Sequence, residues 1–168
     1  MIRRSSELDM ATIARQHYDA VFRFCARRVG PDRAADVSQE TFLTAQRVLH
    51  KFRGESSLTT WLFGIAHNEC RRERRRSVAE PLPLVVDLEI VANVQGESDI
   101  VDRHALNQAL SKLSAEHREV VLLHEIEGLT YEEAAAILQV PVGTVKSRLH
   151  HAFQQMRRAL FSTEEAAR

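Results

Sequence analysis

Residues 129–150 read LTYEEAAAILQVPVGTVKSRLH, and this stretch decides which fold we expect for the chain. Thr130 is followed three residues later by Glu133, which is a capping box: each side chain satisfies a backbone N–H at the start of a helix. The pattern predicts a short helix over Tyr131–Leu138, a tight turn, and a longer helix over Val142–Leu160. This arrangement is typical of a helix-turn-helix.

The longer helix has one apolar and one basic face, and it follows a turn predicted at Val140–Gly143. At about 3.6 residues per turn, four apolar side chains share a face: Val145, Leu149, Ala152 and Met156. The opposite face groups basic and polar side chains: Lys146, Ser147, His150, His151, Gln154, Arg157 and Arg158. No acidic residue occurs between Gly143 and Phe161. Such a face suits the DNA major groove; the alternative is an ordinary helical hairpin with a solvated basic face.

Residues 1–80 are expected to form a bundle of three helices. The first is predicted from about Leu8 to Val29, with Ser6 as its cap. The second runs from about Asp32 to His50, and the third from its cap Ser57 to Arg76. The expected core-facing residues are Met10, Ile13, His17, Val21 and Phe24, then Val37, Thr41, Thr44, Ala45 and Val48, then Leu58, Trp61, Leu62 and Ile65.

A second helical set is predicted after residues 81–100, a stretch with prolines and acids that is interpreted as a linker. Helices are expected over Val101–Leu113 and, after the cap Ser114, over Ala115–Glu127. The sequence therefore predicts an all-α protein of two small helical domains joined by a flexible linker.

The formal net charge of zero conceals basic and acidic zones. Residues 1–80 contain fifteen Lys and Arg against ten Asp and Glu; residues 81–104 contain one against five, and residues 105–168 seven against eight. The neutral total does not exclude a nucleic-acid partner, because the first zone is basic.

The composition predicts a cytoplasmic, soluble protein without metal or cofactor. No apolar run approaches the roughly 18 residues that span a membrane, and the amino terminus lacks the apolar stretch of a signal peptide. Cys25 and Cys70 cannot make a disulfide framework. His67 and Cys70 are three residues apart, but a structural zinc site needs about four ligands in paired clusters. No phosphate-binding loop or paired catalytic carboxylates occur, so an enzyme or metal sensor is the disfavoured alternative.

Two further stretches carry a resemblance to a known family. Asp36–Phe42 (DVSQETF) and Phe52–Asn68 (FRGESSLTTWLFGIAHN) resemble region 2 of the extracytoplasmic-function (ECF) sigma factors of bacterial RNA polymerase. Leu129–His150 is similar to region 4 of the same family. The domains that the resemblance implies are region 2 at 1–80, the acidic linker at 81–100 and region 4 at 101–168.

The resemblance implies an alternative sigma factor, a non-enzymatic subunit that directs polymerase to minus-ten and minus-thirty-five promoter elements and initiates transcription of a particular set of genes. Its partners would be core RNA polymerase (β and β′ subunits), promoter DNA as duplex and as melted single strand, and an anti-sigma factor. No cofactor and no membrane insertion are expected. The rival hypothesis is a helix-turn-helix repressor or activator that binds duplex alone, which would not account for Asp36–Phe42 or Phe52–Asn68.

The resemblance also assigns residues to three surfaces. The core-polymerase-binding residues would be Asp36, Gln39, Glu40 and Leu43. The residues for the minus-ten element would be Phe52, Arg53, Gly54, Ser56, Ser57, Asn68, Arg71, Arg72 and Arg75. The residues for the minus-thirty-five element would be Thr144, Lys146, Ser147, Arg148, His150, His151 and Gln154.

Each surface has a plainer interpretation beside the functional one. An exposed Leu43 among acids favours a partner surface, whereas a solvated acidic face is the alternative. Trp61 is interpreted first as core packing, ahead of base stacking. An arginine run alone is usually a solvated helix end, but its position after Asn68 favours a track for DNA. Where the family commonly has His-Arg-Ala-Arg, this chain has His150–Phe153 (HHAF), so two customary cations are missing and the resemblance does not fix the minus-thirty-five sequence.

Overall fold

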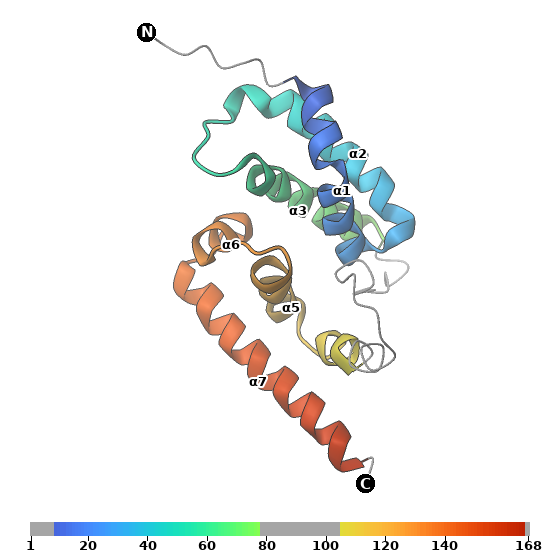
Figure 1. Ribbon diagram of the computed structural model, residues 1–168, viewed down its shortest axis with the longest axis vertical. Helices are drawn as coiled ribbons and strands as arrows, with labels where there is room; N and C mark the ends of the chain where they lie inside the picture. The colour runs from blue at the N-terminus through green and yellow to red at the C-terminus, as the bar shows by residue number, and fades with distance from the viewer. Residues whose placement is uncertain (1–8, 78–104, 167–168) are drawn as a thin grey trace. The chain divides into compact units, whose positions relative to one another are not determined.

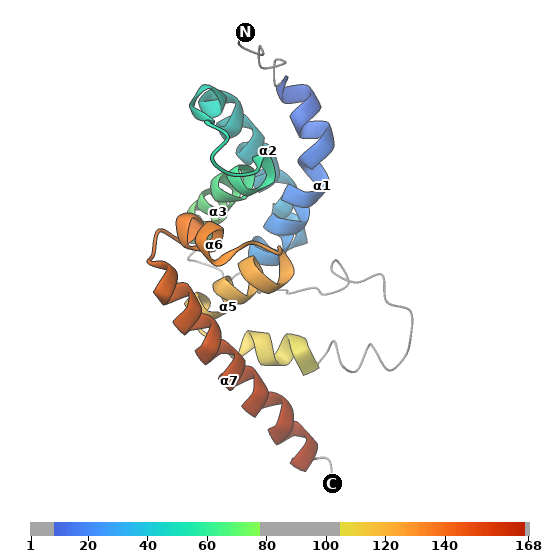
Figure 2. The ribbon, with the colours of Figure 1, turned by 60° about the vertical axis from the view of Figure 1, so that its left-hand side comes forward.

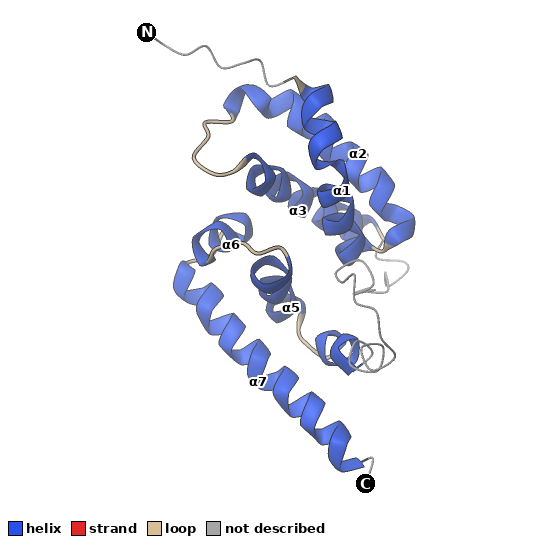
Figure 3. Ribbon diagram, viewed as in Figure 1, coloured by secondary structure: helices blue, strands red, loops and turns tan. Residues whose placement is uncertain are grey.

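The computed structural model describes residues 9–77 and 105–166 (Figure 1). Every regular element in these two ranges is a helix and no strand occurs in them (Figure 3), which confirms the all-α prediction. The chain divides into two compact units, Met1–Val85 and Val86–Arg168. The linker predicted at 81–100 lies outside the described residues. None of the helices in the described ranges is long and apolar enough to cross a membrane.

The first unit is a bundle in which three helices pack against one another (Figure 2). They are α1 (Met10–Val29), α2 (Pro31–Val48) and α3 (Leu58–Arg76), with a single 3-10 turn, η1 (Leu49–Lys51), after α2. The helix predicted to continue to His50 therefore ends two residues earlier, because the backbone tightens into η1.

The first helix is capped by an aspartate. The Asp9 carboxylate accepts hydrogen bonds from the backbone N–H groups of Ala11 and Thr12, both at 3.3 Å. The prediction of Ser6 as the cap is wrong: Ser6 lies outside the described residues, and Asp9 satisfies the free N–H groups as well as a serine would.

A glycine and a proline fix the turn from α1 to α2. Gly30 has φ of 82°, a conformation that costs a side-chain-bearing residue energy, and Pro31 begins α2, where its missing N–H is not needed. The predicted cap of α3 is confirmed, since the Ser57 hydroxyl accepts a hydrogen bond from the Thr60 N–H at 3.0 Å. The turn and the cap set the directions in which α2 and α3 leave the core.

An aromatic contact holds α1 against α3. The rings of Phe24 and Phe63 stack with centroids 4.5 Å apart. The Arg28 guanidinium carbon lies 3.4 Å from the Phe24 ring centroid, and Arg28 donates a hydrogen bond to the Phe24 carbonyl at 2.9 Å. Ring and carbonyl replace water around this buried charge. The buried apolar residues of the first unit are Ile13, Val21, Phe24, Cys25, Ala26, Val29, Ala34, Val37, Ala45, Leu62, Phe63, Ala66 and Cys70.

The core face predicted for α3 is largely wrong. Leu62 is fully buried, but Leu58, Trp61 and Ile65 are only partly buried. Apolar residues occupy both sides of this helix, so periodicity could not decide which side faces inward; contact with Phe24 selects the side that carries Phe63. On the other two helices Met10, His17, Thr44 and Val48 are likewise only partly buried, whereas the other residues predicted for those stripes are buried.

The second unit ends in a helix-turn-helix. Residues 105–111 are helical, within the helix predicted over Val101–Leu113. The later elements are α5 (Ala115–Val121), a π-helical turn η3 (Leu122–Ile126), α6 (Tyr131–Leu138) and α7 (Val142–Ala166), whose side chains are described as far as Leu160. The α-helix predicted over Ala115–Glu127 therefore ends at Val121, because the chain widens into η3. The α7 helix continues six residues beyond its predicted end.

A buried arginine joins the first helix of this unit to α5. Arg118 donates hydrogen bonds to the carbonyls of Leu110, Ser111 and Leu113 at 2.8, 2.9 and 2.8 Å. These carbonyls lie where the preceding helix ends, and a cation there satisfies acceptors that the helix leaves free. The predicted cap Ser114 is confirmed by its hydrogen bond from the His117 N–H at 3.2 Å.

The capping box of α6 is confirmed. The Thr130 hydroxyl accepts from the Glu133 N–H at 3.2 Å, and the Glu133 carboxylate accepts from the Thr130 N–H at 2.9 Å. The turn predicted at Val140–Gly143 begins earlier, because Gln139 adopts the left-handed conformation with φ of 57° and α7 already begins at Val142.

We predict that Gln139→Gly stabilises the protein. A side-chain-bearing residue at positive φ is strained, and glycine removes that strain at some entropic cost, for a net gain of about 0.5–1 kcal/mol. Thermal unfolding followed by circular dichroism would measure the gain.

The matched control is Gly128→Ala, where φ is 70° and a new Cβ would have no atom within 4 Å. This variant should lose about 1 kcal/mol from backbone strain alone. A Gln139→Gly protein no more stable than the wild type would contradict the assignment of strain to Gln139.

Candidate nucleic-acid interface

The outer face of α2 carries acids, an amide and a leucine, as predicted. Asp36, Gln39, Glu40 and Leu43 are all exposed, and Leu43 keeps 41% of its surface accessible. Large apolar side chains with that exposure are few in the described residues, the others being Tyr18 and Phe153. The exposure of Leu43 beside carboxylates is the geometry that favours a partner surface.

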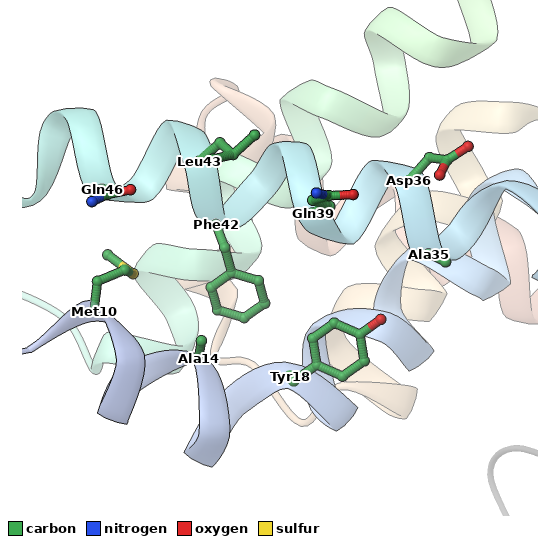
Figure 4. Close-up of a pocket in the computed structure, with 9 residues that line it drawn as sticks. All are labelled: Met10, Ala14, Tyr18, Ala35, Asp36, Gln39, Phe42, Leu43 and Gln46. Carbon is green, nitrogen blue, oxygen red and sulfur yellow. The ribbon is translucent and has the colours of Figure 1, made fainter.

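This face borders a hollow of about 330 Å³ between α1 and α2 (Figure 4). The ring of Phe42 lies between the two helices, with its centroid 6.1 Å from that of Tyr18. The hollow is open and mostly apolar, so it can accept a side chain or helix edge from another macromolecule. Its lining residues are Met10, Ala14, Tyr18, Ala35, Asp36, Gln39, Phe42, Leu43 and Gln46.

The contribution of α1 to this hollow is not predicted from the sequence. Met10 was assigned to the core, and Ala14 and Tyr18 were not assigned. These three residues recur every four positions, which places them on one helix face. The period was visible in the sequence, but only the packing of α1 on α2 shows that this face lies at the rim of the bundle.

The loop before α3 exposes three of the five loop positions predicted for DNA contact. Arg53, Gly54 and Ser57 are exposed, and Phe52 and Ser56 are partly buried. The Phe52 ring packs on Trp61, with ring centroids 5.2 Å apart. This contact anchors the loop to α3 beside the exposed positions.

The outer side of α3 is a continuous stripe from the loop to the arginine run. Trp61 and Asn68 are seven residues apart, about two helical turns, and so share a face. Trp61 is half-buried, and Asn68, Arg71, Arg72 and Arg75 are exposed. The stripe therefore presents an aromatic edge, an amide and then cations, which are the groups that hold an unstacked base and its phosphates.

An ion pair and a hydrogen bond tie this arginine-rich end of α3 to α2, and a second ion pair forms within α3. Arg72 donates to both carboxylate oxygens of Glu69, at 3.1 and 3.2 Å, and Glu69 also accepts from the Thr44 hydroxyl of α2 at 3.1 Å. Arg33 of α2 pairs with Glu73. The carboxylates fix α3 on α2, while Arg71 and Arg75 extend into solvent.

The basic face of α7 lies opposite its buried face, as predicted. Val145, Leu149, Ala152 and Met156 are buried, at 8% exposed or less. Lys146, Ser147, His150, His151 and Gln154 are exposed, and Thr144 is partly buried. Arg148 differs from its neighbours, because its guanidinium pairs with Glu116 of α5 at 2.9 Å. His150 and Gln154 hydrogen-bond to each other at 2.9 Å.

Both units of the chain match known proteins. The family model for Sigma-70 region 2 matches residues 13–79, and the model for Sigma-70, region 4, matches residues 103–156. The RNA polymerase sigma factor YlaC of Bacillus subtilis (strain 168) is 32% identical over 161 residues, which cover 92% of this chain and 93% of that protein. The ECF RNA polymerase sigma-E factor of Salmonella typhimurium (strain 14028s / SGSC 2262) is 33% identical over 130 residues, covering 70% of this chain and 68% of that protein.

The chain belongs to the ECF family of RNA polymerase sigma factors. Among solved structures, the sigma factor RpoE of Bartonella quintana, crystallised with the anti-sigma factor NepR, is 31% identical with a TM-score of 0.67, over 90% of this chain and 96% of that chain. The protein is therefore a transcription initiation factor whose partners are RNA polymerase and promoter DNA.

Each unit of this sigma factor falls under one family model. The region 2 model covers α1 from Ile13 onward and all of α2 and α3, so it includes the α2 face and the α3 stripe. The region 4 model covers the helix-turn-helix to Met156, and hence every exposed side chain proposed on α7. The resemblance to the ECF family found in the sequence is thus confirmed.

The cysteines of the sigma factor are core residues. Cys25 and Cys70 are fully buried, and each is a free thiol. The pKa of Cys70 is raised well above its usual value, mainly by the hydrogen bond with Cys25 and secondly by burial. This thiol therefore stays protonated at neutral pH. Within the described residues no three histidines, cysteines or carboxylates are grouped so as to hold a metal ion.

Proposed function

We propose that the sigma factor binds core RNA polymerase, through its β and β′ subunits, with the outer face of α2 and the adjoining hollow. The observation that supports this role is the exposure of Leu43 and Tyr18, each 41% accessible, beside Asp36 and Glu40. An apolar centre with a charged rim is typical of protein interfaces. The acids favour a basic partner surface.

The loop before α3 and the outer stripe of α3 would capture the minus-ten element as melted single strand. Strand capture needs a pocket wall for an unstacked base, polar groups that read its edge, and cations along the backbone. Trp61 with Phe52 supplies the wall, Asn68 supplies the amide, and the exposed arginines supply the cations.

The exposed face of α7 would bind the minus-thirty-five element as duplex in the major groove. Lys146, Ser147 and Gln154 are exposed on the second helix of a helix-turn-helix, the position from which such helices contact base edges. Arg148 is engaged by Glu116, so its contact with DNA would require exchange of that ion pair for a phosphate.

The chain would work as two modules with separate tasks. Region 2 is proposed at 1–80, the linker at 81–100 and region 4 at 101–168; the family matches at 13–79 and 103–156 and the division into two compact units support these limits. We further infer that the protein catalyses no reaction itself and acts in the cytoplasm, where bacterial RNA polymerase and DNA are.

An anti-sigma factor would restrain the protein. The solved relative from Bartonella quintana, which is 31% identical, is in complex with the anti-sigma factor NepR. An inhibitor of this sigma factor would most simply cover the surfaces proposed to bind polymerase and DNA. Those surfaces carry exposed apolar and basic side chains of the sigma factor.

Run-off transcription with bacterial core polymerase and genomic promoter fragments tests the function directly. Addition of the sigma factor should produce discrete transcripts that core enzyme alone does not. Failure of the protein to associate with core, together with unchanged start-site selection, would contradict the proposed function.

We predict that Glu40→Lys weakens assembly with core polymerase by on the order of tenfold, because it places a cation where the partner surface is proposed to be basic. Co-purification and a titration of labelled sigma factor with core would measure the loss. Glu132→Lys, an equal charge reversal at an exposed position of α6, should assemble as the wild type does. Equal assembly of the Glu40→Lys protein would remove this face from the interface.

We predict that Asn68→Ala slows promoter opening by on the order of tenfold while leaving polymerase binding intact, because a hydrogen-bonded base contact is worth about 1–3 kcal/mol. Permanganate reactivity of melted thymines would follow opening. Gln16→Ala, which truncates an exposed amide on α1, is the matched control. Opening by the Asn68→Ala holoenzyme at the wild-type rate would exclude this residue from base contact.

A further inference from the structure

Side chains from three different elements lie against one another, and one of them, Lys146, belongs to the proposed DNA-binding face. The ring of His124, in η3, stacks on the ring of Tyr131, at the start of α6, with centroids 4.3 Å apart and planes 26° from parallel. The ammonium nitrogen of Lys146, on α7, lies 5.3 Å from the centroid of the Tyr131 ring. This distance is within the range of a cation–π interaction.

His124 lies within the π-helical turn η3. The Glu127 N–H donates to the Leu122 carbonyl at 3.0 Å, and the Leu129 N–H to the Leu123 carbonyl at 3.1 Å. These wide turns are uncommon, and they frequently occur at functional sites.

A hydrogen bond holds the Nδ1 edge of the His124 imidazole. His124 Nδ1 lies 2.6 Å from the Leu129 carbonyl oxygen. A carbonyl only accepts, so Nδ1 carries the hydrogen and donates it. His124 Nε2 lies 3.7 Å from the Glu125 carboxylate. That separation is longer than a hydrogen bond, so the ring that stacks on Tyr131 is held by its Nδ1 hydrogen bond.

Tyr131 is equally constrained. It directly follows Thr130, whose capping box with Glu133 fixes the first turn of α6. The ring is partly buried, whereas Lys146 is exposed. A long, flexible lysine therefore meets a rigid aromatic surface before any DNA is bound.

We propose that Tyr131 is a positioning residue that holds the Lys146 ammonium for contact with the promoter duplex, with His124 supporting the ring. The proposal rests on the duplex-binding role proposed above for α7. A lysine already confined loses less conformational freedom when it binds a phosphate or a guanine edge. The ring restricts Lys146 without neutralising it, unlike the carboxylate that pairs with Arg148.

The test is a set of holoenzymes binding a duplex fragment that carries the promoter found by run-off transcription. The sigma variants are Lys146→Met, Tyr131→Leu, the double variant and the conservative Tyr131→Phe. Affinity is measured over a series of salt concentrations. Lys112→Met, which removes an exposed lysine of the same unit outside α7, is the matched control.

We expect Lys146→Met to weaken binding and to reduce the salt slope by about one, as for the loss of one phosphate contact. Tyr131→Leu should weaken binding about three- to fivefold, the effect expected of one exposed cation–π contact. The double variant should bind no more weakly than Lys146→Met, and Tyr131→Phe should restore the affinity lost in Tyr131→Leu.

The failures are distinguishable. Wild-type affinity of Lys146→Met would overturn both the duplex contact of Lys146 and its positioning. Weak binding by Lys146→Met with wild-type affinity of Tyr131→Leu, or additive losses in the double variant, would overturn the positioning role alone.

A second measurement covers the case in which Tyr131→Leu does not fold. Phenylalanines with increasing ring fluorination at position 131 keep the shape of the ring and progressively weaken its attraction for cations. Affinity should fall with each added fluorine in the Lys146 protein and not in the Lys146→Met protein. An affinity independent of fluorination would overturn the proposal.

Discussion

The first unit depends on the choice of which side of α3 faces the core. A helix in a bundle of three can bury one face and must leave the other to solvent or to a partner. Stacking of Phe63 on Phe24 selects the buried side. Trp61 and Asn68 are thereby turned outward, in line with the exposed arginines. One packing contact thus stabilises the bundle and creates the surface proposed to capture a melted strand.

The same division organises the second unit. The face of α7 that carries Val145, Leu149 and Ala152 is buried, which leaves its basic side outside. Two contacts then restrict individual cations on that side. The carboxylate of Glu116 pairs with Arg148, and the ring of Tyr131 lies beside Lys146. The carboxylate neutralises the charge of Arg148, whereas the ring leaves the charge of Lys146 in place. Arg148 must therefore leave its ion pair to contact DNA, and Lys146 need not.

In region 2 the folded structure determines which acidic and basic side chains are paired with one another and which are exposed. Acids and arginines alternate along α2 and α3, but Glu69 and Glu73 are engaged by Arg72 and Arg33. The exposed acids Asp36 and Glu40 lie on the α2 face, and the end of α3 exposes Arg71, Arg75 and Arg76. A protein of zero net charge therefore offers one surface suited to a basic protein partner and another suited to nucleic acid.

The sequence by itself determined the helices, their caps at Ser57 and Thr130, the helix-turn-helix and the ECF family, because caps, turns and 3.6-residue periods are local and long motifs are specific. The apolar face of α7 was also predictable, since Val145, Leu149, Ala152 and Met156 recur on one side of that helix. Tertiary structure alone decided the inward side of α3, where both sides are apolar, and the hollow to which Tyr18 contributes. It also decided the contact of His124, Tyr131 and Lys146. Those features join side chains from different helices, and no sequence spacing encodes the distance between two helices.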